Sequence, residues 1–396
     1  MSAPLHCPRP TMSTFWTSLR HAAPTDRHDW VDAVRDAGLP TTSDEVWRYA
    51  PLGELDTTTF VGGDETVTPM ANALVVVNGE IVSNSTVAGV TVTSERRGTL
   101  PDSDGDGFES LAFLLAPQAY VISIPATLTE PLIIDQQFTS AFAGVDITVK
   151  VAAGASATVV ERIRGGADSF ISATTRIELA ERAQVVWSTY QSLADSAWFI
   201  ARSRDILARD AHLTQNYAGV GARYDRARQD CELRETGAEN RLMTTYVGHG
   251  NQIHDLRTHQ LHLAPRTTAT LVSKGAVGDS SRSIYTGLIE MEKGARRADA
   301  RQSNHNLLLS NVAHADTVPN LDIRENDVTC AHASSVGPLD EMTRWYLESR
   351  GVPRAVAERL MVLGFFNEML AAWPAQLADT VAQDIATIID DMVVFA

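Results

Sequence analysis

Cysteine is scarce in this 396-residue chain. The three cysteines, Cys7, Cys231 and Cys330, are odd in number and lie far apart in the sequence. A disulfide framework needs several paired cysteines, and such frameworks belong to oxidising compartments. The sequence therefore predicts a protein of the reducing cytoplasm.

Long apolar runs and an excess of basic residues are also missing. No apolar stretch approaches the roughly 18 residues that a membrane span needs. The N-terminal residues lack the charged and apolar regions of a signal peptide. Acidic residues number 49 against 33 Lys and Arg, for a net charge of -16. Phosphate binding needs clustered Lys and Arg, so we expect neither a membrane nor a nucleic acid as a partner.

Motifs for nucleotide hydrolysis and acyl transfer are absent as well. The chain contains no G-x-x-x-x-G-K-[ST] and no G-x-S-x-G, and "GHGNQI" lacks the third glycine of a dinucleotide fingerprint. The sequence gives no argument that this chain is itself an ATPase or a hydrolase.

What the chain does contain is a repeat. Apolar residues followed by small or polar turn residues recur every 26 to 32 positions. They begin at Val151, Leu179, Leu207, Leu233, Leu263, Met291 and Ile323. Strand-like stretches such as "QVVWSTY" flank them, and no helical period accompanies them. Such a period predicts stacked strand units, hence a β-helix, with a β-sandwich as the alternative.

Helical patterns bracket the repeats. Residues 11–38 predict two short helices, and the last 58 residues predict three more, with an apolar stripe that includes Leu360, Leu363 and Phe366. Such stripes are usually core, although a small bundle can also dock a partner. We expect an N-terminal helical region at 1–70, a β-helix at 71–335 and a C-terminal helical domain at 336–396.

Three groups of candidate ligands are better explained by structural roles. "DSDGDGFESLAF" (102–113) begins like a calcium loop, but Phe113 stands where the bidentate Glu belongs, so an acidic surface loop is favoured. His254, His259 and His262 alternate on a strand, and we expect them on the solenoid surface. His314 and Asp316 share a strand face and favour a polar pair, near His305.

Cys330 and His332 are separated by one residue in "DVTCAHASS". On a strand both side chains lie on one face, where a thiolate and an imidazole suit transition metals, including the iron of iron–sulfur clusters. We expect both to point outward, and two ligands do not complete a tetrahedral site. A buried Cys beside a hydrogen-bonded His is the structural alternative.

Several segments resemble the SufB/SufD family of iron–sulfur cluster assembly proteins, and its SufD members in particular. They are "SDEVWRYAPL", "HLAPRTTATLVSKGAV", "ADARQSNHNLLLSNVAHADTVPNLDI", "DVTCAHASSVGPLDEMTRWYLESRGVP" and "AERLMVLGFF". The resemblance implies a right-handed parallel β-helix between helical regions. It implies pairing with SufB through the β-helix and docking of the ABC-type ATPase SufC on the C-terminal helical domain. A homodimer is the alternative assembly.

The resemblance also implies a role for the Cys330–His332 pair. His332 matches a SufD histidine that joins the cluster-building site, and Cys330 matches the neighbouring cysteine. The implied function is a non-catalytic subunit of the SufBCD scaffold, with iron or a transient iron–sulfur cluster at the SufB interface. Some family complexes carry a flavin, which no residue here supports. The alternatives are a SufB-like primary cluster scaffold and a β-helix carbohydrate-active enzyme.

Overall fold

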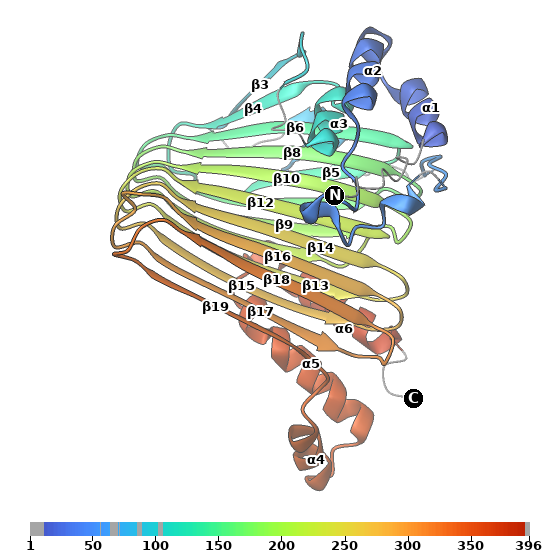
Figure 1. Ribbon diagram of the computed structural model, residues 1–396, viewed down its shortest axis with the longest axis vertical. Helices are drawn as coiled ribbons and strands as arrows, with labels where there is room; N and C mark the ends of the chain where they lie inside the picture. The colour runs from blue at the N-terminus through green and yellow to red at the C-terminus, as the bar shows by residue number, and fades with distance from the viewer. Residues whose placement is uncertain are drawn as a thin grey trace, which may run out of the picture.

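Two facing β-sheets form a parallel solenoid in the computed structural model (Figure 1). The structure describes residues 12–55, 57–63, 70, 72–84, 89–101 and 106–392. Sheet A contains β1 (Leu74–Val77), β2 (Glu80–Asn84), β5 (Leu132–Phe138), β7 (Ser156–Gly165), β9 (Gln184–Leu193), β11 (His212–Gly219), β13 (Glu239–Gly248), β15 (Thr268–Val277), β17 (Asp299–Leu308) and β19 (Thr329–Gly337). Sheet B contains β3 (Thr91–Glu95), β4 (Ala119–Ile124), β6 (Phe142–Val151), β8 (Phe170–Leu179), β10 (Trp198–Leu207), β12 (Tyr224–Leu233), β14 (Ile253–His262), β16 (Arg282–Met291) and β18 (His314–Ile323).

Each turn of the solenoid adds one strand to each sheet. From β4 onward each strand therefore pairs with the second strand after it, in parallel and with an unbroken register, as β10 does with β12. Antiparallel pairs occur at the N-terminal end, between β1 and β2 and between β3 and β4. The predicted parallel β-helix between helical regions is confirmed, and a sandwich of antiparallel sheets is excluded.

The sequence repeat marks one position of this register. Val151, Leu179, Leu207 and Leu233 are the last residues of consecutive sheet B strands and stack on one another in the core. The repeat start predicted at Leu263 is wrong by one residue, because His262 ends β14 and occupies the equivalent buried position. Leu263 lies in the turn that follows and is exposed.

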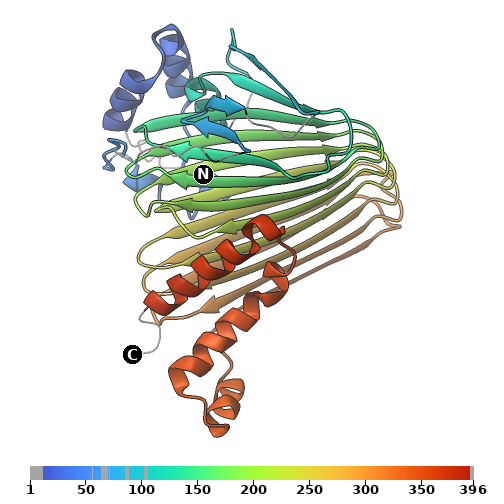
Figure 2. The ribbon, with the colours of Figure 1, turned by 180° about the vertical axis from the view of Figure 1, so that it is seen from behind.

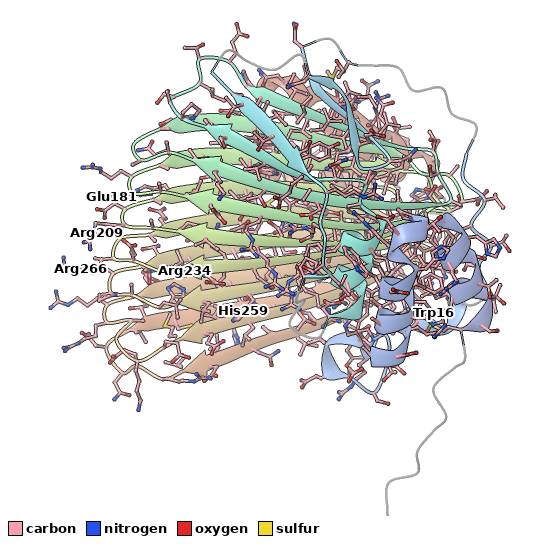
Figure 3. The ribbon with its side chains drawn as sticks, turned by 90° about the horizontal axis from the view of Figure 1, so that it is seen from above. Trp16, Glu181, Arg209, Arg234, His259 and Arg266 are labelled. Atoms are coloured by element: carbon pink, nitrogen blue, oxygen red, sulfur yellow. The ribbon has the colours of Figure 1, made fainter. Side chains whose placement is uncertain are left out.

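The N-terminal region covers the outer face of sheet B. It contains α1 (Ser13–Ala22), α2 (His28–Ala37), α3 (Gly107–Leu115) and the short 3-10 turns Thr25–Arg27, Glu45–Trp47 and Leu52–Glu54. The guanidinium of Arg226, on β12, lies 3.6 Å from the ring centroid of Trp47 and donates to the carboxylate of Asp255 on β14. The cation–π contact, together with a hydrogen bond from Arg226 to the Val46 carbonyl at 3.2 Å, attaches the N-terminal segment to the sheet, and the ion pair holds the guanidinium in place. Figure 3 shows the charged turn residues Glu181, Arg209 and Arg266 at the edge of the solenoid away from these helices.

The C-terminal region crosses the outer face of sheet A (Figure 2). It consists of α4 (Glu341–Ser349), α5 (Arg354–Leu370) and α6 (Ala375–Asp391). Lys274 Nζ on β15 lies 3.1 Å from Glu368 of α5, and the Tyr190 hydroxyl on β9 donates to Asp384 of α6. The helix α4 extends beyond the solenoid (Figure 1). Among the described residues no helix is long and apolar enough to cross a membrane.

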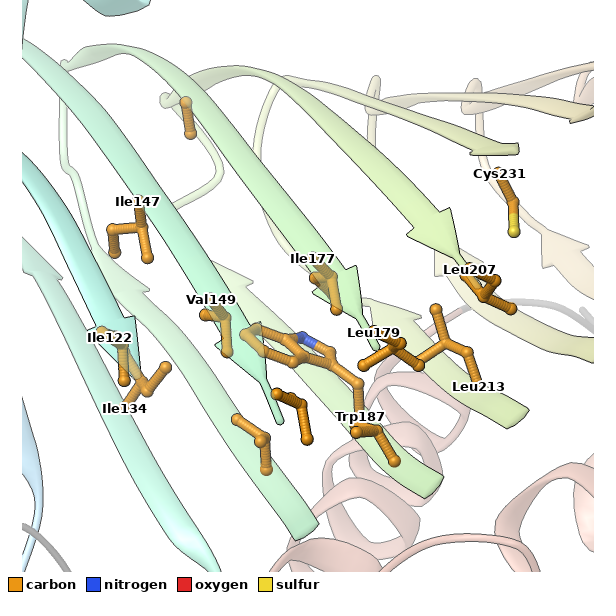
Figure 4. Close-up of a cluster of buried hydrophobic side chains, with 14 of the residues drawn as sticks. Ile122, Ile134, Ile147, Val149, Ile177, Leu179, Trp187, Leu207, Leu213 and Cys231 are labelled. Atoms are coloured by element: carbon orange, nitrogen blue, oxygen red, sulfur yellow. The ribbon is translucent and has the colours of Figure 1, made fainter. Parts of the chain in front are cut away.

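Apolar and polar side chains share the interior of the solenoid. One cluster packs aliphatic residues around Trp187 and includes the thiol of Cys231 (Figure 4). Beside it, the buried carboxyl group of Asp205 accepts hydrogen bonds from Ser203 Oγ at 2.6 Å and Gln215 Nε2 at 2.9 Å. Burial disfavours the charged form and raises the pKa of Asp205 from 3.8 to about 7.

Replacing Asp205 by Asn should therefore change how stability depends on pH. Between about pH 4 and pH 7 the wild-type carboxyl is ionised in the unfolded chain but protonated in the folded one, so the folded state binds more protons. Stability must then fall as the pH rises through this window. Urea unfolding of wild type and Asp205→Asn should show the wild type losing stability relative to the variant from pH 4 to pH 7.

Asp379→Asn, at an exposed position of α6, is the matched control and should show no such trend. A stability difference between wild type and Asp205→Asn that stays constant across the window would contradict the assignment of a protonated interior acid.

Candidate functional site

The last turn of the solenoid leaves its inner face open. Strands β18 and β19 are the edge strands of sheets B and A, and no further strand pairs with either of them among the described residues. We call the inward-facing residues of these two strands the open mouth. They are Ala315, Thr317, Pro319, Leu321 and Ile323 of β18 and Cys330, His332, Ser334 and Val336 of β19.

Register defines which side chains face inward. Cys330 and His332 stack directly on Ala300 and Gln302 of β17, whose side chains are buried in the solenoid. Across the mouth, Ser334 Oγ lies 2.9 Å from Thr317 Oγ1, so the two strands face each other there.

The prediction that Cys330 and His332 share a strand face is confirmed, but the prediction that they point outward is wrong. They lie on the inner face and reach solvent because no further turn covers them.

The two predicted ligands differ in environment. His332 is exposed, and neither ring nitrogen has a hydrogen-bond partner among the described residues. Cys330 is half-buried against the core, and burial raises the pKa of its thiol, with Asp299 adding to the effect. A thiol that stays protonated at neutral pH is a weak nucleophile. A bound metal ion would displace the proton, because thiolate is the form that ligates.

The pair does not form a complete metal site within this chain. Within the part of the chain that the structure describes, no group of three or more His, Cys, Asp and Glu side chains converges. Zinc sites, for example, have three protein ligands when catalytic and four when structural. Iron or a cluster held at Cys330 and His332 would therefore need ligands from another chain.

The histidines of β14 are not where we expected them. His254 and His262 face the interior and are completely buried, so their predicted surface location is wrong. His254 Nδ1 lies 3.1 Å from the Asp225 carboxylate, and His262 Nδ1 lies 2.8 Å from Thr267 Oγ1. Burial lowers the pKa of His262 to about 4. His259 does lie on the outer face, with Nε2 3.0 Å from Glu290.

The remaining candidates have structural roles. His314 Nε2 lies 3.3 Å from Asp316, which confirms the predicted pair, and His305 Nδ1 lies 2.7 Å from Ser335 Oγ. Asp106 caps α3 by accepting from the Phe108 backbone N–H.

This leaves the other two cysteines and the acidic residues of the loop at 102–113. Cys231 is buried, and burial raises the pKa of its thiol. Cys7, Asp102 and Asp104 lie outside the described residues.

The C-terminal helices carry a second candidate surface, made of exposed apolar side chains. Three residues of α4, Met342, Trp345 and Tyr346, are between 55% and 70% exposed. With Val356 and Leu360 of α5, also exposed, they form what we call the helical apolar patch. Large exposed apolar side chains gathered on one small domain indicate a protein interface. The signal in the sequence was the spacing of positions 342, 345 and 346, which places them on one helix face.

Comparisons with known proteins agree with this architecture. Residues 135–365, more than half of the chain, match the family model described as "SUF system FeS cluster assembly, SufBD core domain". The iron–sulfur cluster assembly protein SufD of Escherichia coli (strain K12) is 27% identical over 366 residues, covering 85% of each chain. The protein of the same name from Bacillus subtilis (strain 168) is 38% identical over 133 residues, covering 34% of this chain and 30% of the relative.

A third relative is an iron–sulfur cluster assembly SufBD family protein of Mycobacterium leprae (strain TN). It is 27% identical over 350 residues, covering 84% of this chain and 86% of the relative. The chain belongs to the SufB/SufD family of iron–sulfur cluster assembly proteins of the SUF system, and within that family it is most like SufD.

Proposed function

We propose that this protein is a non-catalytic scaffold subunit that builds iron–sulfur clusters in the cytoplasm together with a SufB-type chain and a SufC-type ATPase. The observation that carries the proposal is the incomplete ligand pair of Cys330 and His332 at the open mouth. A two-ligand pair, placed where the solenoid ends, becomes a useful site when a second chain supplies the other ligands.

The open mouth suits a second solenoid as its partner. Edge strands present unpaired backbone groups, which proteins normally cover or block. Here Leu321, Ile323 and Val336 are exposed on the same edge, each by about 40%. A SufB-type chain that extends the two sheets across this edge would cover these side chains and bring its own ligands to His332. A second copy of this chain is the alternative occupant.

Iron or a growing cluster is the cargo of the mouth. Imidazole and thiolate both bind iron, and the exposed His332 is the more accessible of the two. The half-buried Cys330 would ligate after losing its proton to the metal. No feature of the described residues supports a flavin site. The absence of a third convergent ligand in the described residues disfavours a primary scaffold that holds a cluster alone.

The helical apolar patch is the proposed docking surface for the ATPase. Lys274 holds α5 to sheet A, Tyr190 holds α6, and Asn216 holds the connection between the two helices, whereas α4 extends away from the sheet. A force applied to α4 would reach the solenoid through these contacts. ATP-driven association of two ATPase subunits would then shift the interface at the mouth, a coupling through rigid-body movement.

Replacing His332 by Ala in the assembled complex should reduce the rate of cluster formation by about tenfold or more, because removal of a ligand or its support typically has effects of this size. The rate is measured as transfer of a cluster to an apo-ferredoxin. His305→Ala is the matched control, since His305 lies on the adjacent strand, bonded to Ser335 and facing outward. A His332→Ala complex that matures clusters at the wild-type rate would refute the site.

Replacing Trp345 by Asp should weaken binding of the ATPase roughly 30-fold or more, because a buried Trp at an interface typically contributes about 2 kcal/mol. Binding is measured by calorimetry between the purified subunits. Val82→Asp, at an exposed apolar position on β2 near the other end of the solenoid, is the control. Equal ATPase affinity for wild type and Trp345→Asp would exclude the helical apolar patch as the docking surface.

A further inference from the structure

Gln302 lies at the floor of the open mouth. It belongs to β17, faces the interior and is 4% exposed. No described residue makes a hydrogen bond to its side-chain amide, and its Oε1 atom is completely buried without a partner. An amide buried without a hydrogen bond costs about 1 to 3 kcal/mol, so this position demands an explanation.

The strand below Gln302 and the facing sheet offer its amide no hydrogen-bond partner in register. On the strand below, the residue in register is Leu271, which has no polar group. Across the solenoid, Gly287 makes room for the amide, since a Cβ atom at Gly287 would lie between 2.4 and 2.6 Å from Nε2, Oε1 and Cδ of Gln302. Pro319, in register above Gly287, lacks a backbone N–H.

The position above Gln302 belongs to His332. The two residues are register partners in neighbouring parallel strands, which lie about 4.8 Å apart. The imidazole of His332 has no hydrogen-bond partner among the described residues, as the amide below it has none. Asn304, the next inward residue of β17, lies under Ser334 instead. Its carbonyl oxygen accepts from Asn306, whereas its Nδ2 is buried without a partner and makes no hydrogen bond to Gln302.

We propose that Gln302 is a positioning residue that accepts a hydrogen bond from one ring N–H of His332. The bond fixes the tautomer of the imidazole and leaves the lone pair of the other nitrogen directed to the opening of the mouth. Metal-ligating histidines generally donate their second N–H to a carbonyl or carboxylate, which orients the ring and raises its basicity. The inference rests on the proposed role of His332 as an iron ligand.

The amide can present either end to the ring, because neither end has another partner to lose. Only the carbonyl orientation leaves the imidazole ready to bind a metal ion. Gly287 contributes to this arrangement because it has no side chain. A larger residue there would displace the Gln302 amide from beneath His332.

The tautomer of His332 tests the proposal directly. Nitrogen-15 NMR of the full-length chain, at a pH where the imidazole is neutral, measures the two tautomers, and the His332 signal is assigned by its loss in His332→Ala. Wild type should show one predominant tautomer. Gln302→Leu should show a mixture, whereas Gln302→Glu, which retains an acceptor, should restore the wild-type tautomer.

Asn304→Leu is the matched control, since it alters the same strand and the same inner face under Ser334 rather than under His332. It should leave the His332 tautomer unchanged. Gln302→Met, closer in shape to Gln, replaces Gln302→Leu if the leucine variant fails to fold. An unchanged tautomer ratio in Gln302→Leu or Gln302→Met would overturn the proposal.

Metal binding gives the second measurement. Titration of the assembled complex with Co²⁺, followed by its absorption bands, should show affinity about tenfold lower in Gln302→Leu than in wild type, with recovery in Gln302→Glu. Equal Co²⁺ affinity in all three proteins would overturn the positioning role.

If the proposed function is wrong but Gln302 does position His332, the two sets of measurements would disagree. The tautomer would still respond to Gln302→Leu, but His332→Ala would leave cluster transfer at the wild-type rate.

Discussion

In-register stacking of parallel strands is the constraint on which the rest of this structure depends. Each turn buries its inner side chains and satisfies its backbone groups by contact with the next turn. The arrangement repeats from β4 to β19 and then stops. The inner side chains of the last turn are in register with the core residues of the turn below, but no further turn of the described chain covers them, so they reach solvent. The residues of the proposed site, Cys330 and His332, lie where the stacking stops.

This origin explains the chemistry of the open mouth. Positions equivalent to buried Ala300 and Gln302 hold Cys330 and His332, and the imidazole of His332 would be costly to bury in the middle of a solenoid without a hydrogen-bond partner. The C-terminal helices leave the mouth open because they pack on the outer face of sheet A instead. The proposed ligand pair and the helical apolar patch of α4 and α5 therefore lie on separate surfaces, and under the proposed function each surface would contact a different subunit.

Much of the fold could be predicted from the sequence, because the apolar residue that ends each sheet B strand recurs with the period of one turn. The single error in that series, Leu263 for His262, arose because a histidine occupies an apolar position. Hydrophobic periodicity does not count histidine as an apolar residue, yet His262 and His254 lie inside because each makes a hydrogen bond there, His262 to Thr267 and His254 to the Asp225 carboxylate. The sequence pattern does not show that either pair of residues comes together in the interior.

The direction of Cys330 and His332 could not be predicted for a similar reason. Alternation along a strand places two residues on one face, but it does not say which face. That choice depends on the register with β17, a contact between residues about 30 positions apart. Gln302 and Gly287 are ordinary residues in the sequence. Only the structure shows that Gln302 lies beneath His332 and that Gly287 faces the Gln302 amide from the other sheet.

We propose that a second chain completes the open mouth. Hydrogen–deuterium exchange of this protein, alone and in complex with a SufB-type subunit, tests it most directly, because exchange reports on the backbone amides of the edge strands. The account predicts that peptides covering residues 314–337 become strongly protected in the complex. Unchanged exchange across β18 and β19, with protection confined to other surfaces, would contradict it.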